Sequence, residues 1–209
     1  MQYDLFSATG CMRCKIVKSY MADNSIAYKE FDFKLEGKDE FNTFYRKNRP
    51  DIYRGKEGIE FPILYNGKKV IQGVGVIIAF LKKENLLDQF VTRSLLSHGW
   101  VSGLNASAVD ISSGDDFISV VKYLKTHGLK IQIETNGRNS EILSSLIEQS
   151  LVDRLIFNLK GPAELYEIIT GTALDKDELK LSLYLLEKCL EYQIILPLHP
   201  FLRAENQKD

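Results

Sequence analysis

The sequence predicts an α/β protein built from two successive parts. Short apolar runs alternate with longer amphipathic stretches along the chain, as expected for strands connected by helices. The chain has 209 residues, of which 44% are hydrophobic, and a net charge of -1, which suits a globular protein of one or two domains. The pattern changes between residues 88 and 98, so we expect domains at residues 1–90 and 98–209.

Composition also restricts the location and the partners. No apolar run is long enough to cross a bilayer, and the N-terminal stretch lacks the basic region of a signal peptide. Three cysteines are too few for a secreted disulfide scaffold, and the near-neutral charge gives no reason to expect nucleic acid. We therefore expect a soluble cytoplasmic protein that binds neither a membrane nor a nucleic acid.

The first part begins with a strand that leads into a pair of cysteines. Residues 3–6 alternate like a strand, and a helical pattern starts at the Cys11-Met12-Arg13-Cys14 motif. A thiol at a helix N-terminus faces unpaired backbone N–H groups, which lowers its pKa and favours the nucleophilic thiolate. We predict Cys11 as the exposed catalytic nucleophile and Cys14, one turn later, as the resolving thiol.

Metal binding and a purely structural role are alternatives for this pair. A four-thiolate zinc or iron–sulfur site needs a second pair, whereas Cys189 is the only other cysteine. Cys189 lies in an amphipathic stretch, residues 185–190, where we expect a buried small hydrophobe in a helix. The sequence thus predicts no bound metal and no cofactor.

A β-hairpin and a last helix complete the first part. Residues 60–73 alternate like two strands, and Asn66-Gly67 between them predicts a tight type I′ turn. Pro62 opens the first of these strands, where its missing N–H costs nothing. The helical pattern that follows covers residues 74–86.

This order of elements, with the CxxC motif and the X-Pro strand, resembles the thioredoxin/glutaredoxin superfamily over residues 1–88. The resemblance implies a cis peptide bond before Pro62 and a substrate-binding edge formed by Phe61, Pro62, Gly73 and Val74. Met12 stands where glutaredoxins usually have proline, and no aspartate follows the glycine pair. Protein or small disulfides are therefore the expected substrates, rather than glutathione mixed disulfides.

The second part alternates strands and helices at a spacing that implies parallel pairing with right-handed crossovers. The expected strands are residues 100–104, 108–111, 130–134, 154–159 and 192–196, and the expected helices are residues 116–127, 140–149, 163–170 and 177–190.

Four strings in this part, residues 128–137, 151–162, 166–171 and 198–200, resemble the radical S-adenosylmethionine superfamily. The resemblance is to activating enzymes of glycyl-radical proteins, such as that of anaerobic ribonucleotide reductase, and it implies a partial (β/α) barrel. The CxxxCxxC motif of that family is absent, and a [4Fe–4S] cluster needs several thiolates. We therefore expect an inactive docking or scaffold domain.

Four polar residues fall at or just beyond the carboxyl ends of predicted parallel strands, where α/β proteins bind ligands: Glu134, Asn136, Lys160 and His199. Solvated loop residues without a ligand are the alternative. Three functions stay open. The chain is a dithiol oxidoreductase with a docking domain, or a non-catalytic adaptor of a radical S-adenosylmethionine activating enzyme or glycyl-radical protein, or a protein that binds adenosylmethionine, a metal or a cluster without turnover.

Overall fold

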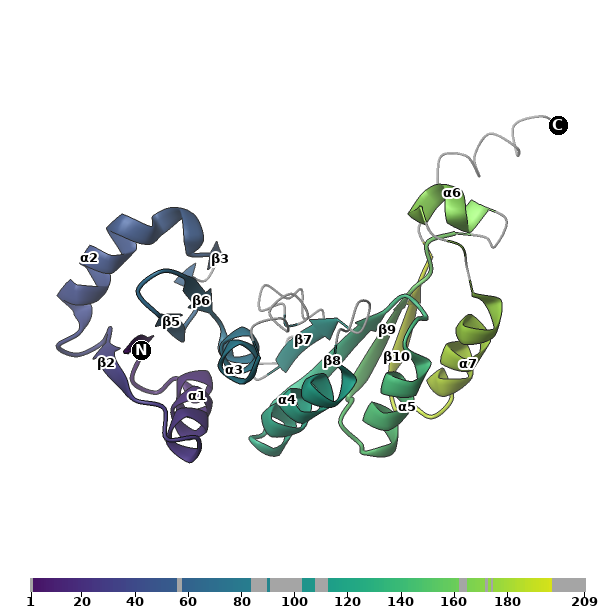
Figure 1. The fold of residues 1–209 in the computed structure, drawn as a ribbon, viewed down its shortest axis with the longest axis horizontal. Helices are drawn as coiled ribbons and strands as arrows, with labels where there is room; N and C mark the ends of the chain where they lie inside the picture. The colour runs from purple at the N-terminus through teal and green to yellow at the C-terminus, as the bar shows by residue number, and fades with distance from the viewer. Residues whose placement is uncertain are drawn as a thin grey trace.

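The computed structural model describes residues 2–55, 58–83, 90, 103–107, 113–161, 165–171, 173 and 175–196. These residues form an α/β protein with two four-stranded sheets and a short two-stranded one (Figure 1). One large sheet is mixed and the other is parallel, and within the described residues neither closes into a barrel. The α/β class predicted from the sequence is confirmed, whereas the expected boundary at residues 88–98 lies outside the described residues except for Phe90.

The mixed sheet has the order β2-β1-β5-β6, with β1 parallel to β2 and antiparallel to β5. Its strands are β1 (Tyr3–Ser7), β2 (Tyr28–Asp32), β5 (Ile63–Tyr65) and β6 (Val70–Gln72). The other elements of this part are α1 (Met12–Asp23), α2 (Lys38–Asn48), η1 (Arg49–Asp51), β3 (Arg54–Gly55), β4 (Gly58–Ile59) and α3 (Val74–Lys82).

Successive side chains of β1 pack into two different hydrophobic clusters, because neighbouring residues of a strand point to opposite faces of the sheet. Leu5 belongs to the buried cluster that includes Val17 of α1 and Ile77 of α3. Phe6 belongs to a second cluster with Phe41 of α2. Helices α1 and α3 therefore cover one face of the mixed sheet and α2 covers the other, as Figure 1 shows.

The β5–β6 hairpin is confirmed, but its turn is not the predicted type I′. A type I′ turn needs a positive φ at both central residues, and at Asn66-Gly67 only the glycine has one, at 88°. The Asn66 side-chain oxygen instead accepts the backbone N–H groups of Lys68 and Lys69, at 3.0 and 2.8 Å. The local asparagine turn thus replaces the tighter backbone turn.

The second sheet has the order β10-β9-β8-β7, and all its pairs are parallel, as predicted. Its strands are β7 (Gly103–Ser107), β8 (Lys130–Thr135), β9 (Arg154–Asn158) and β10 (Tyr192–Ile195), and its helices are α4 (Gly114–Thr126), α5 (Ser140–Glu148), α6 (Tyr166–Thr170) and α7 (Lys176–Leu186). None of the helices in the described part of the chain combines the length and apolarity needed to cross a membrane.

Two expectations for this part need correction. Strand β7 lies at Gly103–Ser107, so it overlaps the end of the expected strand 100–104 and continues beyond it, while residues 100–102 and 108–111 lie outside the described residues. Helix α7 ends at Leu186, so Cys189 follows the helix and is only partly buried, although the partial burial raises the pKa of its thiol. The amphipathic pattern continues past the helix because the turn also packs against the core.

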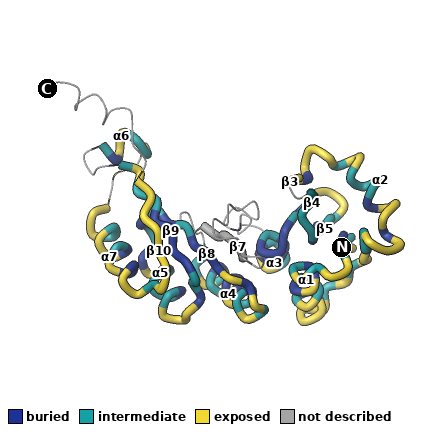
Figure 2. The backbone as a smooth tube through the Cα atoms, turned by 180° about the vertical axis from the view of Figure 1, so that it is seen from behind, coloured by how far each residue is buried: buried dark blue, intermediate teal, exposed yellow. Residues whose placement is uncertain are grey.

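Helix α4 of the second part packs against helices α1 and α3 of the first part, and this packing connects the two parts. One buried cluster includes Val17 of α1, Ile78 of α3 and Val121 of α4. The rings of Tyr20 and Tyr123 meet edge to face at 5.0 Å beside this cluster. Figures 1 and 2 accordingly place α1, α3 and α4 between the two sheets. The apolar faces of the two parts are buried against each other.

Candidate functional site

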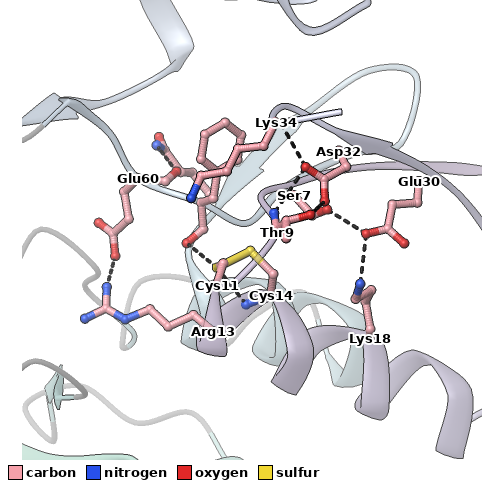
Figure 3. The surroundings of a disulfide bond; sticks show 12 residues. Ser7, Thr9, Cys11, Arg13, Cys14, Lys18, Glu30, Asp32, Lys34 and Glu60 are labelled. Carbon is pink, nitrogen blue, oxygen red and sulfur yellow. Dashed lines mark hydrogen bonds and ion pairs between the residues drawn. A yellow bond between two sulfur atoms is a disulfide. The ribbon is translucent and has the colours of Figure 1, made fainter. Parts of the chain in front are cut away.

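The two cysteines lie at the start of α1, directly after the turn that follows β1 (Figure 3). Their Cα atoms are 5.3 Å apart, and their sulfur atoms are at disulfide distance. Cys11 is the N-cap of α1, and its Sγ accepts the backbone N–H of Cys14 at 3.1 Å. Cys14 is 1% exposed, whereas Cys11 is partly exposed, so the expected order of exposure is confirmed.

The turn before Cys11 is held by a carboxylate at the end of β2. Asp32 accepts the backbone N–H of Thr9 at 3.1 Å and its hydroxyl at 2.7 Å. Partial burial acts to raise the pKa of Asp32, but these hydrogen bonds and one from the Lys34 amide outweigh it and hold the pKa below its usual value. Gly10, with φ 84°, provides the reversal that brings Cys11 to the helix start.

The loop before β5 lies against the cysteine pair. The Phe61–Pro62 peptide bond is cis, as the resemblance implied, and the Phe61 carbonyl oxygen lies 3.9 Å from Cys11 Sγ. The Gly73 amide donates to the Pro62 carbonyl oxygen at 2.9 Å. Phe61 thus lies next to the dithiol and is partly exposed, whereas Pro62, Gly73 and Val74 are buried, and Val74 packs in the core.

An ion pair that sequence reasoning missed connects the CxxC turn with this loop. The Arg13 guanidinium pairs with the Glu60 carboxylate (Figure 3). The main-chain oxygen of Glu60 also accepts Gln72 Nε2 at 2.8 Å. Burial raises the pKa of Glu60, and the nearby Arg13 opposes this effect. The sequence contained one indication of this ion pair: Glu60 stands two residues before Pro62, in the loop expected beside the cysteines.

Within the described residues, the turn at Gly128 in the second part lies next to Met12 of the CxxC motif. A Cβ placed on Gly128, in the turn between α4 and β8, would lie 3.5 Å from Met12 Cε. Met12 is still 41% exposed to solvent. A molecule that docks on Met12 therefore meets both parts of the chain.

The predicted ligand residues of the second part are only partly brought together. Glu134 of β8 accepts a 3.5 Å hydrogen bond from Asn158 of β9, while Asn136 accepts the Arg138 amide at 3.2 Å within its own turn. Lys160 is exposed, and His199 lies outside the described residues.

The donor set of the chain does not fit the iron–sulfur cluster of the radical S-adenosylmethionine family. Cys11 and Cys14 lie in the first part, and Cys189 is a free cysteine after α7. Among the described residues, no group of three or more histidine, cysteine, aspartate or glutamate side chains is placed to hold a metal ion. A cluster held by several thiolates of one chain therefore lacks ligands.

No protein-family model matches the chain. Among curated proteins, the chain is 30% identical over 83 residues to a protein of Methanocaldococcus jannaschii that is named as a glycyl-radical enzyme activating enzyme. The match covers 37% of this chain and 35% of the relative, so the chain spans about a third of the length of that relative. The comparison establishes a distant and partial similarity to an activating enzyme.

Proposed function

We propose that this chain is a thiol–disulfide oxidoreductase that uses the Cys11–Cys14 dithiol on protein or small disulfides. In this proposal residues 1–90 form a glutaredoxin-like domain with a thioredoxin fold, and residues 98–209 form a partial (β/α)-barrel-like domain for docking. One observation carries the proposal: Cys11 caps α1, accepts the Cys14 N–H through its sulfur, and lies beside the Phe61 carbonyl.

The cap geometry supports the roles of the two thiols. The Cys14 N–H and the positive end of the α1 dipole both stabilise a negative sulfur on Cys11. Because Cys14 is buried, an incoming disulfide meets Cys11 first. Cys14 remains within reach of the Cys11 sulfur for the second step.

The reaction balances as two thiol–disulfide exchanges. The Cys11 thiolate attacks one sulfur of the substrate disulfide, forms a mixed disulfide and releases the other sulfur as a thiolate, which takes up a proton. Cys14 then loses its proton and attacks Cys11 Sγ, which releases the second substrate thiol. The substrate gains two electrons and two protons, and the dithiol becomes a disulfide that an external thiol reductant must reduce.

The proposed substrate edge is the loop before β5, next to Cys11. The edge beside Cys11 offers the partly exposed Phe61, whose carbonyl oxygen lies 3.9 Å from Cys11 Sγ, and the hydrogen bond between the buried Gly73 and Pro62 holds this loop in place. An extended peptide that carries a disulfide can pair with such an edge without a charged anchor. This supports protein or peptide disulfides as the substrate class.

Thiol variants test this proposal. In turnover with a protein disulfide and an external thiol reductant, we expect Cys11→Ser to abolish activity. Pre-reduced Cys14→Ser, mixed with the protein disulfide after the reductant is removed, should accumulate a mixed disulfide on Cys11, visible by mass spectrometry. Cys189→Ser is the matched control and should retain the wild-type rate. Wild-type turnover by Cys11→Ser would contradict the proposal.

An adaptor function is the second candidate, and the similarity to a glycyl-radical enzyme activating enzyme favours it. An adaptor would bind a radical S-adenosylmethionine activating enzyme or a glycyl-radical protein through the second part of the chain. Binding measured by calorimetry should then be equal for the wild-type chain and Cys11→Ser. If the partner is instead the substrate of a redox enzyme, Cys11→Ser can no longer form a mixed disulfide with it, and the two chains differ.

Binding of a cluster or of adenosylmethionine is the third candidate. Anaerobic incubation with iron and sulfide should give no stoichiometric [4Fe–4S] absorption and no cleavage of adenosylmethionine, because too few thiolates are present. A cluster bridged by the Cys11–Cys14 pairs of two chains is the one exception. It would suppress dithiol turnover in proportion to the iron bound, so iron content and activity are measured together.

A further inference from the structure

A cavity of about 480 Å³ lies between α2 and the mixed sheet, and none of the redox-site residues lines it. Its volume is within the range of small-molecule binding sites. Four aromatic side chains line its interior, Phe6, Phe31 and Tyr65 from the sheet and Phe44 from α2. The cavity therefore offers an apolar environment to a ligand of about the size of one or two rings.

The aromatic wall is ordered by ring contacts. The Phe6 ring stacks on Phe44 at 4.2 Å and on Phe31 at 5.2 Å, and Phe44 meets Tyr65 at 5.2 Å. Phe6 is 3% exposed, so the innermost ring is fixed by the core. The Lys29 ammonium lies 4.7 Å from the centre of the Phe31 ring, so one end of this stack already accepts a cation. A ligand meets a preformed wall rather than one it must assemble.

The charged groups around the cavity are predominantly acidic. Asp4 of β1 and Asp39 and Glu40 of α2 line it, together with the single ammonium of Lys47. Three carboxylates against one ammonium give the lining a net charge of -2, and the Lys29 ammonium at the Phe31 ring reduces the net charge around the cavity to -1. An organic anion is repelled by this lining, and an organic cation is attracted.

We propose that this cavity binds a small organic cation, an amine carried on a ring-sized apolar body. The apolar body lies among the aromatic side chains, and the ammonium group faces Asp39 and Glu40, which are exposed at the first turn of α2. The site uses no residue of the dithiol, so amine binding and disulfide exchange are separable properties of the chain.

Titration of the isotope-labelled full chain with 2-phenylethylammonium tests the proposal by NMR. Neutral 2-phenylethanol and anionic 3-phenylpropionate are the matched probes, and we expect affinity to fall in that order. Asp39→Asn and Glu40→Gln should each weaken amine binding by up to about fivefold, and Lys47→Gln should strengthen it by a similar factor. Asp51→Asn, an exposed change outside the cavity, should leave the affinity unchanged.

Thr43→Trp guards against an effect on folding, since Thr43 is exposed and lines the cavity. It should abolish binding of the amine while the melting temperature stays at the wild-type value. Cys11→Ser should bind the amine like the wild-type chain, which separates this inference from the proposed function. Absence of saturable shifts at the lining residues, equal affinity for 3-phenylpropionate, or wild-type binding by Thr43→Trp would overturn the proposal.

Discussion

The two sheets of this chain use the start of a following helix in different ways. After β1, the N-cap side chain is Cys11, and its sulfur accepts the N–H of Cys14. After β8, the N-cap Asn139 makes no side-chain cap, and the first amide of α5, at Ser140, donates to Glu178 of α7 at 2.6 Å. One helix start is capped by a sulfur atom, while the other connects two helices.

The polar residues around these helix starts differ in the same way. Thr9 and Asp32 hold the turn that brings Cys11 forward. After β8, the side chains of Thr135 and Asn136 accept the amides of Gly137 and Arg138 in their own turn. At the end of β8, the edge where α/β proteins often bind ligands is therefore occupied by local hydrogen bonds. In the proposed function, the first part accordingly carries the chemistry, and the polar residues after β8 stabilise local structure.

The largest predicted effect breaks the packing that both parts share. Val121 of α4 is fully buried in the common cluster, so Val121→Asp places an unpaired carboxylate there and should destabilise the chain by about 3–5 kcal/mol. Ser119→Asp, at an exposed position of the same helix, is the control and should change stability little. Urea unfolding followed by circular dichroism and by hydrogen exchange measures both parts.

We expect amides of β1 and of β8 to lose protection together in Val121→Asp. Independent packing of the two parts would instead leave the β1 amides and the thiol chemistry intact while β8 unfolds. That result would contradict the prediction that α4 stabilises both parts.

Local patterns were sufficient to predict most elements of the fold. The step from strand to helix around Cys11, the hairpin after Pro62 and the apolar strands β8 and β9 are visible in the sequence because period and turn residues are local properties. The thiol pair followed from the same reasoning, since a helix start and a CxxC spacing occur together.

Long-range contacts could not be predicted in this way. Arg13 and Glu60 are 47 residues apart, and no periodicity relates them. The packing of α4 on α1 and α3 depends on the relative orientation of the two parts, which the alternation of strands and helices leaves open. The aromatic cavity under α2 depends on how Phe44 and Phe6 stack, and this too is a tertiary property.

The second prediction concerns the substrate preference of the proposed dithiol in the first part. We expect a protein disulfide to be reduced at least about tenfold faster than a glutathione mixed disulfide, because each missing charge-assisted anchor forgoes about 1.5–3 kcal/mol. Turnover of the two substrates is compared at equal enzyme and reductant concentrations. Equal rates would mean that charged anchors for glutathione exist elsewhere in the chain.

The third prediction concerns the ion pair next to the dithiol. Glu60→Gln removes a negative charge near Cys11 and should lower the midpoint of its alkylation against pH by roughly a few tenths of a unit. Arg13→Gln removes the positive charge and should raise the midpoint. Glu148→Gln, in the second part, is the control and should leave the midpoint unchanged. Shifts of the same sign in both variants would show that the pair acts through structure rather than charge.

The smallest predicted effect lies at the contact between the parts. Burial, then the nearby Asp23 carboxylate, raises the pKa of Tyr123 from 10.0 to about 12. The folded chain therefore keeps this proton at pH values where the unfolded chain loses it, so the stabilisation is complete below pH 10 and is lost as pH rises towards 12.

Tyr123→Phe should remove that part of the alkaline loss of stability, which we expect to be about 1 kcal/mol or less because the side chain is only partly buried. Urea midpoints below pH 10 and between pH 10 and 12 measure the difference, with Tyr184→Phe, at an exposed position of α7, as the control. The tyrosinate absorbance should also lose a component that titrates near pH 12. If Tyr123→Phe and the wild-type chain lose stability in parallel, Tyr123 is solvated in solution and the two parts do not close over it.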